Sequence, residues 1–138
     1  MFLWKDYIKV SKSLQKYSKI NSTVTEGFLR SGVSRAYYAA YHAALNYAIG
    51  KGFNYWTYKR ILRSRPGNKG ESGPHAVLIQ FLLDQPDLRV RSLGSELQRC
   101  KLKRTQCDYK DDIIVDDRFV NILYIQTDNI QTLIPTLP

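Results

Sequence analysis

Four polar side chains share one narrow line along the segment 34–49: Arg35, Tyr38, His42 and Asn46, spaced i, i+3, i+7 and i+11. Helical periodicity places such positions on one face. A guanidinium, a phenol, an imidazole and an amide bind fixed partners, whereas a surface helix normally carries Lys and Glu. Because an imidazole can move protons near pH 7, His42 is a candidate catalytic residue. The structural alternative is a polar seam that ties a helical bundle together.

Arg104 is the second candidate. It lies at helical spacing on an apolar stripe of the segment 88–109 that also contains Leu93, Leu97, Cys100 and Cys107. Asp108 follows one turn later and can pair with it. An inward charge needs a partner, because burying it unpaired is costly. Two explanations remain open: an Arg104–Asp108 ion pair holds the bundle, or Arg104 binds an anion or phosphate at the rim of a groove.

No metal site or other cofactor is expected. Helical spacing puts Cys100 and Cys107 about 10 Å apart along the axis, too far for a disulfide. Only His42 and His75 remain as further candidate metal ligands, which is too few for a structural metal site. The thiols are interpreted as small apolar residues in a reducing compartment. His75 is expected to be a capping or loop residue.

The elements that must position these residues are helices. Apolar periodicity predicts them over 3–19, 25–49, 76–83, 88–109 and 118–133. The fold class is therefore all-α: one domain over 1–138, an antiparallel bundle of four to five helices. Residues 53–62 are either an extended segment or a short helix, and the Gly- and Pro-rich stretch 65–73 is a basic loop.

Local signals refine these helices. Thr23 or Thr25 is the expected cap of the second helix, and the end of the acidic linker 110–117 is expected to cap the last one. The first helix is expected to turn these residues inward: Leu3, Tyr7, Val10, Leu14 and Tyr17. The last helix is expected to close the fold with these apolar residues: Phe119, Ile122, Leu123, Ile125 and Ile130.

The formal net charge of +9 is unevenly distributed. Residues 59–104 contain eleven Lys or Arg against four acids, a net charge of +7. A concentrated basic region indicates a polyanionic partner such as RNA or DNA, and the alternative is a basic surface with no specific ligand. With no signal peptide and no apolar stretch suited to a bilayer, a cytoplasmic protein without membrane contact is expected.

Two runs together resemble a known family. Residues 35–42 (RAYYAAYH) and 104–109 (RTQCDY) resemble the HEPN family, the higher eukaryotes and prokaryotes nucleotide-binding domain, in its prokaryotic branch with R-x-Y-Y-A-x-x-H and R-x-x-x-D-Y motifs. The resemblance implies a helical bundle that usually dimerises and acts on nucleotides or RNA. It also implies a nucleotidyltransferase-type or other partner in a toxin–antitoxin-like or defence system.

Many members of that family are metal-independent endoribonucleases with an R-x4–6-H motif. Arg104 matches the arginine of this motif, but the residue five positions further on is Tyr109 and not histidine. A phenol titrates near pH 10 and moves protons poorly at pH 7. We therefore expect RNA cleavage to be absent or slow.

Three functions follow. In the first, the chain binds RNA or nucleotides, and Tyr38 or Tyr109 stacks a base. Phosphate is held by Arg104 and by the basic segment with Arg99, Lys101 and Lys103. Arg35 and Asp108 complete this binding surface. In the second, it is a metal-independent ribonuclease toxin in which Arg104 acts with His42 or Tyr109. In the third, it is a non-catalytic subunit that docks another protein. The first two require Arg104 to lie within reach of the Arg35, Tyr38 and His42 line.

Overall fold

The computed structural model describes residues 3–20, 25–68 and 73–138, and within them the chain is helical without strands. Six α-helices and a terminal 3₁₀ turn follow one another: α1 Asp6–Ile20, α2 Thr25–Gly50, α3 Tyr55–Arg63, α4 Pro74–Leu83, α5 Leu88–Tyr109, α6 Asp117–Leu133 and η2 Ile134–Thr136. The predicted all-α bundle is confirmed. It has one helix more than expected, because residues 55–63 form a short helix and not an extended segment.

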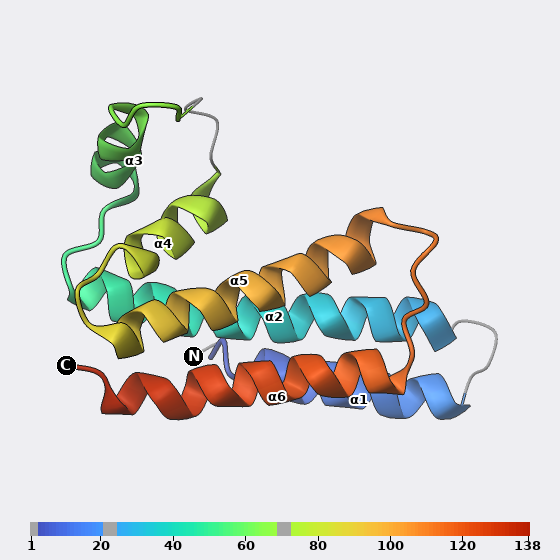
Figure 1. Ribbon diagram of the computed structural model, residues 1–138. Coiled ribbons are helices and arrows are strands. Elements are labelled where there is room, and N and C mark those ends of the chain that lie inside the picture. Colours follow the sequence, from blue (N-terminus) through green and yellow to red (C-terminus); the bar gives the residue numbers. More distant parts are fainter. Residues whose placement is uncertain (1–2, 21–24, 69–72) are drawn as a thin grey trace.

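Helix α2 is the central element of the bundle. It packs against α1, α5, α6 and α4 (Figure 1). The long helices α1, α2, α5 and α6 alternate in direction along the chain, as in an antiparallel bundle. The face of α2 opposite the line of Arg35, Tyr38, His42 and Asn46 is buried, with residues from Val33 to Ala48 forming its centre. Alanines on this face let α5 and α6 approach closely, and Tyr37 fills the remaining volume with no exposed surface.

Side-chain caps fix where several helices begin. Asn54, Asp87 and Asp116 each accept a hydrogen bond from a backbone N–H in the first turn of the helix that follows. The cap at the end of the acidic linker is thus confirmed. Thr25 begins α2, but its hydroxyl donates to the Ser18 carbonyl of α1 at 2.7 Å. Thr23 lies outside the described residues.

The predicted inward face of the first helix is wrong for three of its five residues, whereas Tyr7 and Leu14 are half-buried. The helix begins at Asp6 and not at residue 3, so Leu3 precedes it. Leu3, Val10 and Tyr17 are 40%, 43% and 59% exposed, whereas Ser11 and Ser18 are buried. The reason is a close approach of α1 to α2: the Ser11 hydroxyl donates to the Gly32 carbonyl at 2.6 Å and lies 2.7 Å from the hydroxyl of Tyr124 on α6. Small hydrogen-bonded residues allow this approach, so the helix turns its serines inward.

The last helix is also rotated relative to the prediction. Ile122 and Ile125 are 39% and 62% exposed, while Leu123 and Ile130 are buried as expected. The inward stripe also contains Val120, Tyr124 and Thr127. Polar groups on this stripe find partners, because the Thr127 hydroxyl donates to the Tyr124 carbonyl at 3.0 Å.

Arg30 of α2 holds the end of α5 in place. Its guanidinium donates to the carbonyl oxygens of Cys107, Lys110 and Ile113 at 2.6, 3.0 and 2.8 Å, and it pairs with Glu26 at 2.8 Å. Helices end with carbonyls that have no partner within the helix, and Arg30 satisfies these groups from a neighbouring helix. The last turns of α5, which include Arg104 and Asp108, are thereby fixed against α2.

Helices α3 and α4 form a smaller unit at one end of the bundle (Figure 1). Helix α4 packs against α5 and α2, and α3 packs against α4. The Asp84 carboxylate ties them together, accepting a hydrogen bond from the Tyr58 hydroxyl and pairing with Arg65 at 2.8 Å. The predicted loop 65–73 is described only in part. Within it, Gly67 has a φ of +79°, which favours glycine.

Candidate functional site

Arg104 lies on the inward stripe of α5, as predicted, with its side chain 19% exposed. Its Nε is 2.7 Å from Asp108 Oδ2, and the N–H does not point at the oxygen, so the contact is an ion pair and not an aligned hydrogen bond. Its Nη2 donates to the Tyr38 hydroxyl at 3.4 Å. The expectation that Arg104 reaches the polar line of α2 is therefore confirmed, at the long end of hydrogen bonding.

Aromatic rings surround this guanidinium. Its carbon lies 5.5 Å from the ring centroid of Tyr38 and 5.9 Å from that of Tyr37. Both distances are in the range of cation–π attraction. Tyr37 is fully buried and Tyr38 half-buried, so the arginine rests on a fixed aromatic surface.

His42 continues the line beyond Tyr38. Its ring stacks on Trp4, with centroids 3.4 Å apart and planes at 10°, and meets the edge of Tyr41 at 5.1 Å. Its centroid is 6.4 Å from that of Tyr38. Trp4 thus covers one face of His42, and the imidazole is half-buried between the N-terminal segment and α2.

His75 belongs to the same cluster, which the sequence analysis missed. It sits in the first turn of α4, as expected, but its Nδ1 is 2.7 Å from the Tyr37 hydroxyl and its ring is 4.2 Å from that of Tyr41. The expectation of a simple capping or loop residue is therefore wrong. A proline-initiated helix predicts where His75 lies along the chain, but no local signal reveals a contact with a residue 38 positions away.

Burial sets the protonation of these groups. It raises the pKa of the Tyr37 hydroxyl well above its usual value and lowers the pKa of His42. The pKa of His75 is lowered to about 4, first by burial and then by the positive charges of Arg104 and Lys101. At pH 7 both imidazoles are neutral, and the phenol between His75 and Arg104 keeps its proton.

Arg35 and Asp108 meet at a shallow hollow beside the cluster. It measures about 360 Å³ and is lined by Arg30, Ser31, Ser34, Arg35, Cys107 and Asp108. The Arg35 guanidinium is exposed and lies 5.0 Å from the ring centroid of Tyr7. The hollow therefore offers serine hydroxyls and one exposed guanidinium next to the Arg104–Asp108 pair. Asn46, at the far end of the line, lines a different hollow.

The other predicted site residues lie around this centre. Tyr109 is 72% exposed at the end of α5, and within the described part of the chain it shares no ion pair, hydrogen bond or cation–π contact with Arg104. Arg99 is exposed and pairs with Glu96 at 2.6 Å, and the Lys103 ammonium lies 4.4 Å from the Phe119 ring. Lys101 is half-buried and close enough to His75 to lower its pKa. Of these four, only Lys101 is joined to the cluster.

The chemistry available here is anion binding and proton acceptance. A guanidinium on an aromatic surface holds phosphate, a phenol donates a hydrogen bond, and neutral imidazoles accept protons. Both cysteines are unpaired and buried, and burial raises the pKa of Cys100 to about 12 and of Cys107 to about 11, so neither is a thiolate at neutral pH. Among the described residues, no group of three or more His, Cys, Asp or Glu is placed to hold a metal ion.

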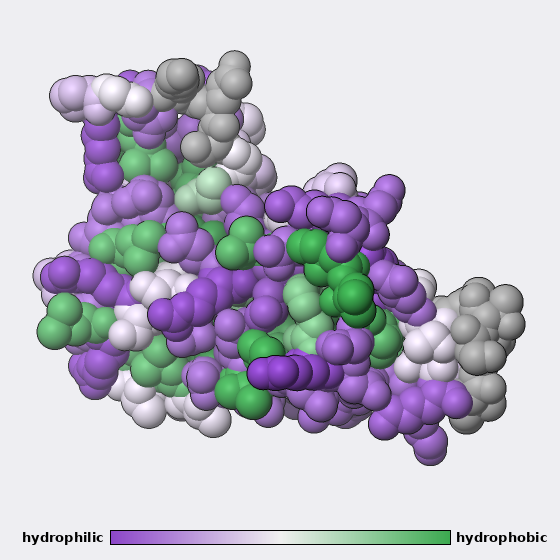
Figure 2. Space-filling view, turned by 45° about the vertical axis from the view of Figure 1, so that its right-hand side comes forward, coloured by the Kyte–Doolittle hydropathy of each residue, from purple (hydrophilic) through white to green (hydrophobic). Residues whose placement is uncertain are grey.

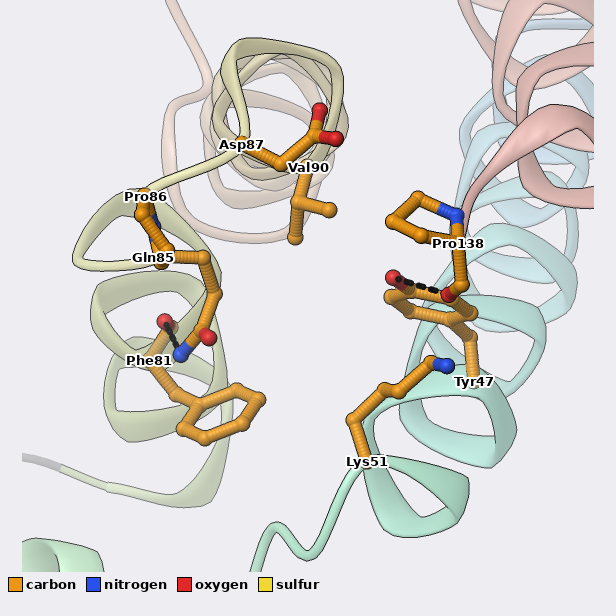
Figure 3. Close-up of a pocket in the computed structure, with 8 residues that line it drawn as sticks. All are labelled: Tyr47, Lys51, Phe81, Gln85, Pro86, Asp87, Val90 and Pro138. Atoms are coloured by element: carbon orange, nitrogen blue, oxygen red, sulfur yellow. Dashed lines mark hydrogen bonds between the residues drawn. The ribbon is translucent and has the colours of Figure 1, made fainter.

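A second pocket lies at the opposite end of α5 (Figure 3). It measures about 240 Å³ and is lined by Tyr47, Lys51, Phe81, Gln85, Pro86, Asp87, Val90 and Pro138. Helical rise places Val90 about 21 Å along the axis from Arg104. The pocket is mostly apolar and carries one cation and one carboxylate, so it adds nothing to a phosphate site near Arg104.

Comparison of the chain with protein families, curated proteins and solved structures finds no match. In the described parts of the chain, no helix has both the length and the apolar character needed to cross a membrane.

Proposed function

We propose that the chain is a HEPN-like protein that binds single-stranded RNA or nucleotides at the surface shared by α2 and α5. The observation that carries the proposal is the position of Arg104. Its guanidinium is held by Asp108 and Tyr38, rests on two tyrosine rings, and adjoins a hollow with Arg35 on its rim. This arrangement suits a phosphate group with a neighbouring base.

Arg104 keeps donor capacity for a ligand. A guanidinium has five N–H donors in a planar fork. Among the described residues, Nε pairs with Asp108, Nη2 reaches Tyr38, and Nη1 has no hydrogen-bond partner. A purely structural arginine in a bundle is expected to use its whole fork, as Arg30 does with three carbonyls and a carboxylate.

The test is RNA binding as a function of salt. A labelled single-stranded RNA of about 12 nucleotides suits the site sizes of single-strand-binding modules. Wild-type affinity is expected to fall steeply with salt, because each phosphate contact contributes about −0.7 to the slope of log K against log[salt]. Arg104→Ala is expected to weaken binding and to make this slope shallower by about 0.7.

Arg118→Ala is the matched control, because Arg118 is exposed and belongs to α6, a helix that contributes no residue to the cluster. Arg104→Lys retains the charge but not the fork, and is expected to bind with intermediate affinity. Equal affinities for Arg104→Ala and Arg118→Ala, both folded, would refute the proposed site. No binding to RNA or nucleotides at low salt would leave the protein-docking subunit as the function.

The two neutral imidazoles favour a second candidate, slow metal-independent RNA cleavage. In such a reaction the 2′-hydroxyl loses a proton and attacks phosphorus, and the 5′-oxygen leaves with a proton, which gives a cyclic phosphate and a free hydroxyl. His42 or His75 is able to accept the first proton, and Arg104 to stabilise the phosphorane charge. With both pKa values lowered, neither resting ring is protonated at pH 7, so the proton on the leaving 5′-oxygen comes from water or from the ring that accepted the first proton.

Cleavage by His42→Ala, His75→Ala and Tyr109→His separates these possibilities. We expect wild-type cleavage to be absent or slow. Tyr109 is 72% exposed, and among the described residues no ion pair, hydrogen bond or cation–π contact joins it to Arg104, so Tyr109→His is expected to leave cleavage unchanged. Robust wild-type cleavage that His42→Ala or His75→Ala abolishes would make the ribonuclease toxin the function. A nucleotidyltransferase-type partner, which the family resemblance suggests, is tested by co-expression and co-purification.

A further inference from the structure

Helix α3 turns one face inward and leaves the opposite face to solvent. Leu62 is buried, and Tyr55 and Tyr58 pack against the core. These three positions share one side of the helix. The helix is attached to the rest of the molecule through α4 and through the Asp84 contacts, and it lies farthest from α1 and α6 in Figure 1.

The outward face combines one large aromatic ring with cations. Trp56 is 71% exposed, and Arg60 and Arg63 follow it at i+4 and i+7, on the same line of the helix. Lys59 flanks this line, with its ammonium 5.9 Å from the Trp56 ring and 2.9 Å from the Tyr55 hydroxyl. With Arg65, residues 53–68 carry four cations and no acid.

This combination fits single-stranded nucleic acid better than a bilayer. An exposed indole offers a flat face on which a base stacks, and cations at one-turn spacing meet the phosphates on either side. A helix that lies on a membrane needs a continuous apolar strip. Here Ile61, the other large apolar side chain exposed on α3, lies about 140° around the helix from Trp56, so no strip forms.

The inward side of α3, and not its Trp56 face, borders a hollow shared with α5. This hollow of about 180 Å³ is lined by Leu62 and Asn68 on the α3 side and by Gln98 and Lys101 on α5, among others. Lys101 lies about one turn before Arg104 and acts on the charge of His75. A strand that leaves the Arg104 site along α5 therefore passes a cation before it reaches α3.

We propose that the outward face of α3 is a second contact surface for single-stranded RNA, on which Trp56 stacks a base and Arg60 holds a flanking phosphate. The ligand class rests on the proposed function, whereas the residues and the surface are separate from the Arg104 site.

The experiment measures binding of the same RNA of about 12 nucleotides by variants of the full chain. Loss of one stacked base in Trp56→Ala is expected to raise Kd about five-fold or more, with the salt slope unchanged. Arg60→Ala is expected to raise Kd and to make the salt slope shallower by about 0.7. Trp56→Phe keeps an aromatic face, so its affinity is expected to lie between those of the wild type and Trp56→Ala.

Fluorescence gives an independent readout, because a stacked base quenches indole emission. The quench on RNA titration is expected in the wild type and is expected to shrink in Trp56→Phe. Tyr17→Ala is the matched control for an exposed aromatic, since Tyr17 is 59% exposed on α1. Trp56 and Arg60 are exposed, so their variants are expected to unfold at the wild-type temperature.

The outcomes separate the two surfaces. If Arg104→Ala weakens binding while Trp56→Ala and Arg60→Ala bind like Tyr17→Ala, the α3 surface is refuted and the proposed function stands. If only the α3 variants weaken binding, the α3 surface stands and the Arg104 site is refuted. Trp56-dependent binding to phosphatidylserine vesicles without RNA binding would overturn the α3 proposal in favour of a membrane contact. A wild type that binds no RNA overturns the α3 proposal, and one that binds neither RNA nor nucleotides overturns the proposed function as well.

Discussion

Arg104 and His75 act on each other through the aromatic residues between them. The guanidinium lies against Tyr37, and the hydroxyl of Tyr37 bonds to His75. A positive charge on one side of the phenol disfavours a second positive charge on the other side, which adds to burial in lowering the pKa of His75. The protonation of one residue therefore reports on the integrity of the whole cluster.

We predict that folding stability falls as the pH is lowered from about 6.5 to about 4.5. An unfolded histidine has a pKa near 6.5 and gains a proton in this range, whereas His75 has a folded-state pKa of about 4 and stays neutral. The unfolded state then binds more protons, so acid favours unfolding. Aspartates with lowered pKa, such as Asp84, lose their contribution only below about pH 4.

Urea unfolding at several pH values checks this prediction, with His75→Gln as the variant. The amide retains an acceptor for the Tyr37 hydroxyl but does not titrate. His75→Gln is expected to lose less stability than the wild type between pH 6.5 and 4.5. Part of the loss that remains in this variant comes from His42, whose pKa is also lowered in the folded state. Equal losses of stability in the wild type and His75→Gln would contradict the role of His75 in this pH dependence. An NMR titration of His75 near pH 6.5 would contradict its lowered pKa.

Single residues divide into those that the sequence reveals and those that only the fold reveals. Arg104 is visible because it interrupts an apolar stripe, and its ion pair follows from the i, i+4 spacing of Asp108. His75 and Trp4 are not visible, because their partners are reached through tertiary packing. Arg30 is equally hidden, since the carbonyls that it satisfies belong to the end of α5 and to the linker that follows it.

At the scale of helices, close approach is governed by glycine as well as by alanine. A Cβ atom added at Gly94 of α5 would lie 3.1 Å from Leu82 Cβ and 3.1 Å from Leu83 Cδ2, on α4. Leu82 is fully buried, so it has little room to move. This contact sets the distance between α4 and α5, and with it the position of His75 relative to α5.

We predict opposite effects for two glycine substitutions. Gly94→Ala is expected to destabilise the fold, because overpacking typically costs about 1–3 kcal/mol and exceeds the gain in helix propensity. Gly27→Ala in α2, where a Cβ atom meets nothing within 4 Å, is expected to be neutral or to stabilise by up to about 1 kcal/mol. Urea unfolding of both variants measures the difference, and a Gly94→Ala protein as stable as Gly27→Ala would mean that α4 moves away freely.

Periodicity predicts helices more reliably than it predicts which side of a helix is buried. The ranges of α2, α4, α5 and α6 follow from apolar spacing, caps and glycine. The face of α1 does not, because hydrophobicity favours Val10 and Tyr17 whereas the fold buries Ser11. A buried serine is stable only when a partner such as the Gly32 carbonyl is present, and this partner is known only after α1 and α2 have been packed together.

At the scale of the whole molecule, apolar side chains appear on the surface in separate patches. Figure 2 shows such patches within a largely hydrophilic face. On α5, Leu102 and Tyr109 are 60% and 72% exposed and lie two turns apart on the same side. Ile114, in the linker that follows, is 82% exposed.

We predict a homodimer, as the family resemblance implies, with this apolar side of α5 in the interface. Burial of exposed aromatic and aliphatic residues is typical of such contacts. Sedimentation at micromolar concentration is expected to give twice the chain mass of 16.0 kDa, and Leu102→Glu is expected to shift it towards the monomer. A wild-type monomer would refute this prediction without affecting the Arg104 site.

The most direct test of the account is the RNA affinity of Asp108→Asn. If Arg104 binds phosphate, Asp108 positions the guanidinium while its negative charge opposes that of the ligand. Asparagine keeps an oxygen for the guanidinium and removes the negative charge. We therefore predict binding tighter by roughly five-fold at low salt, because two like charges about 4 Å apart in water repel by about 1 kcal/mol. If Arg104 and Asp108 only hold the bundle together, Asp108→Asn will lower the unfolding temperature and leave RNA affinity unchanged or weaker, and that result would contradict the account.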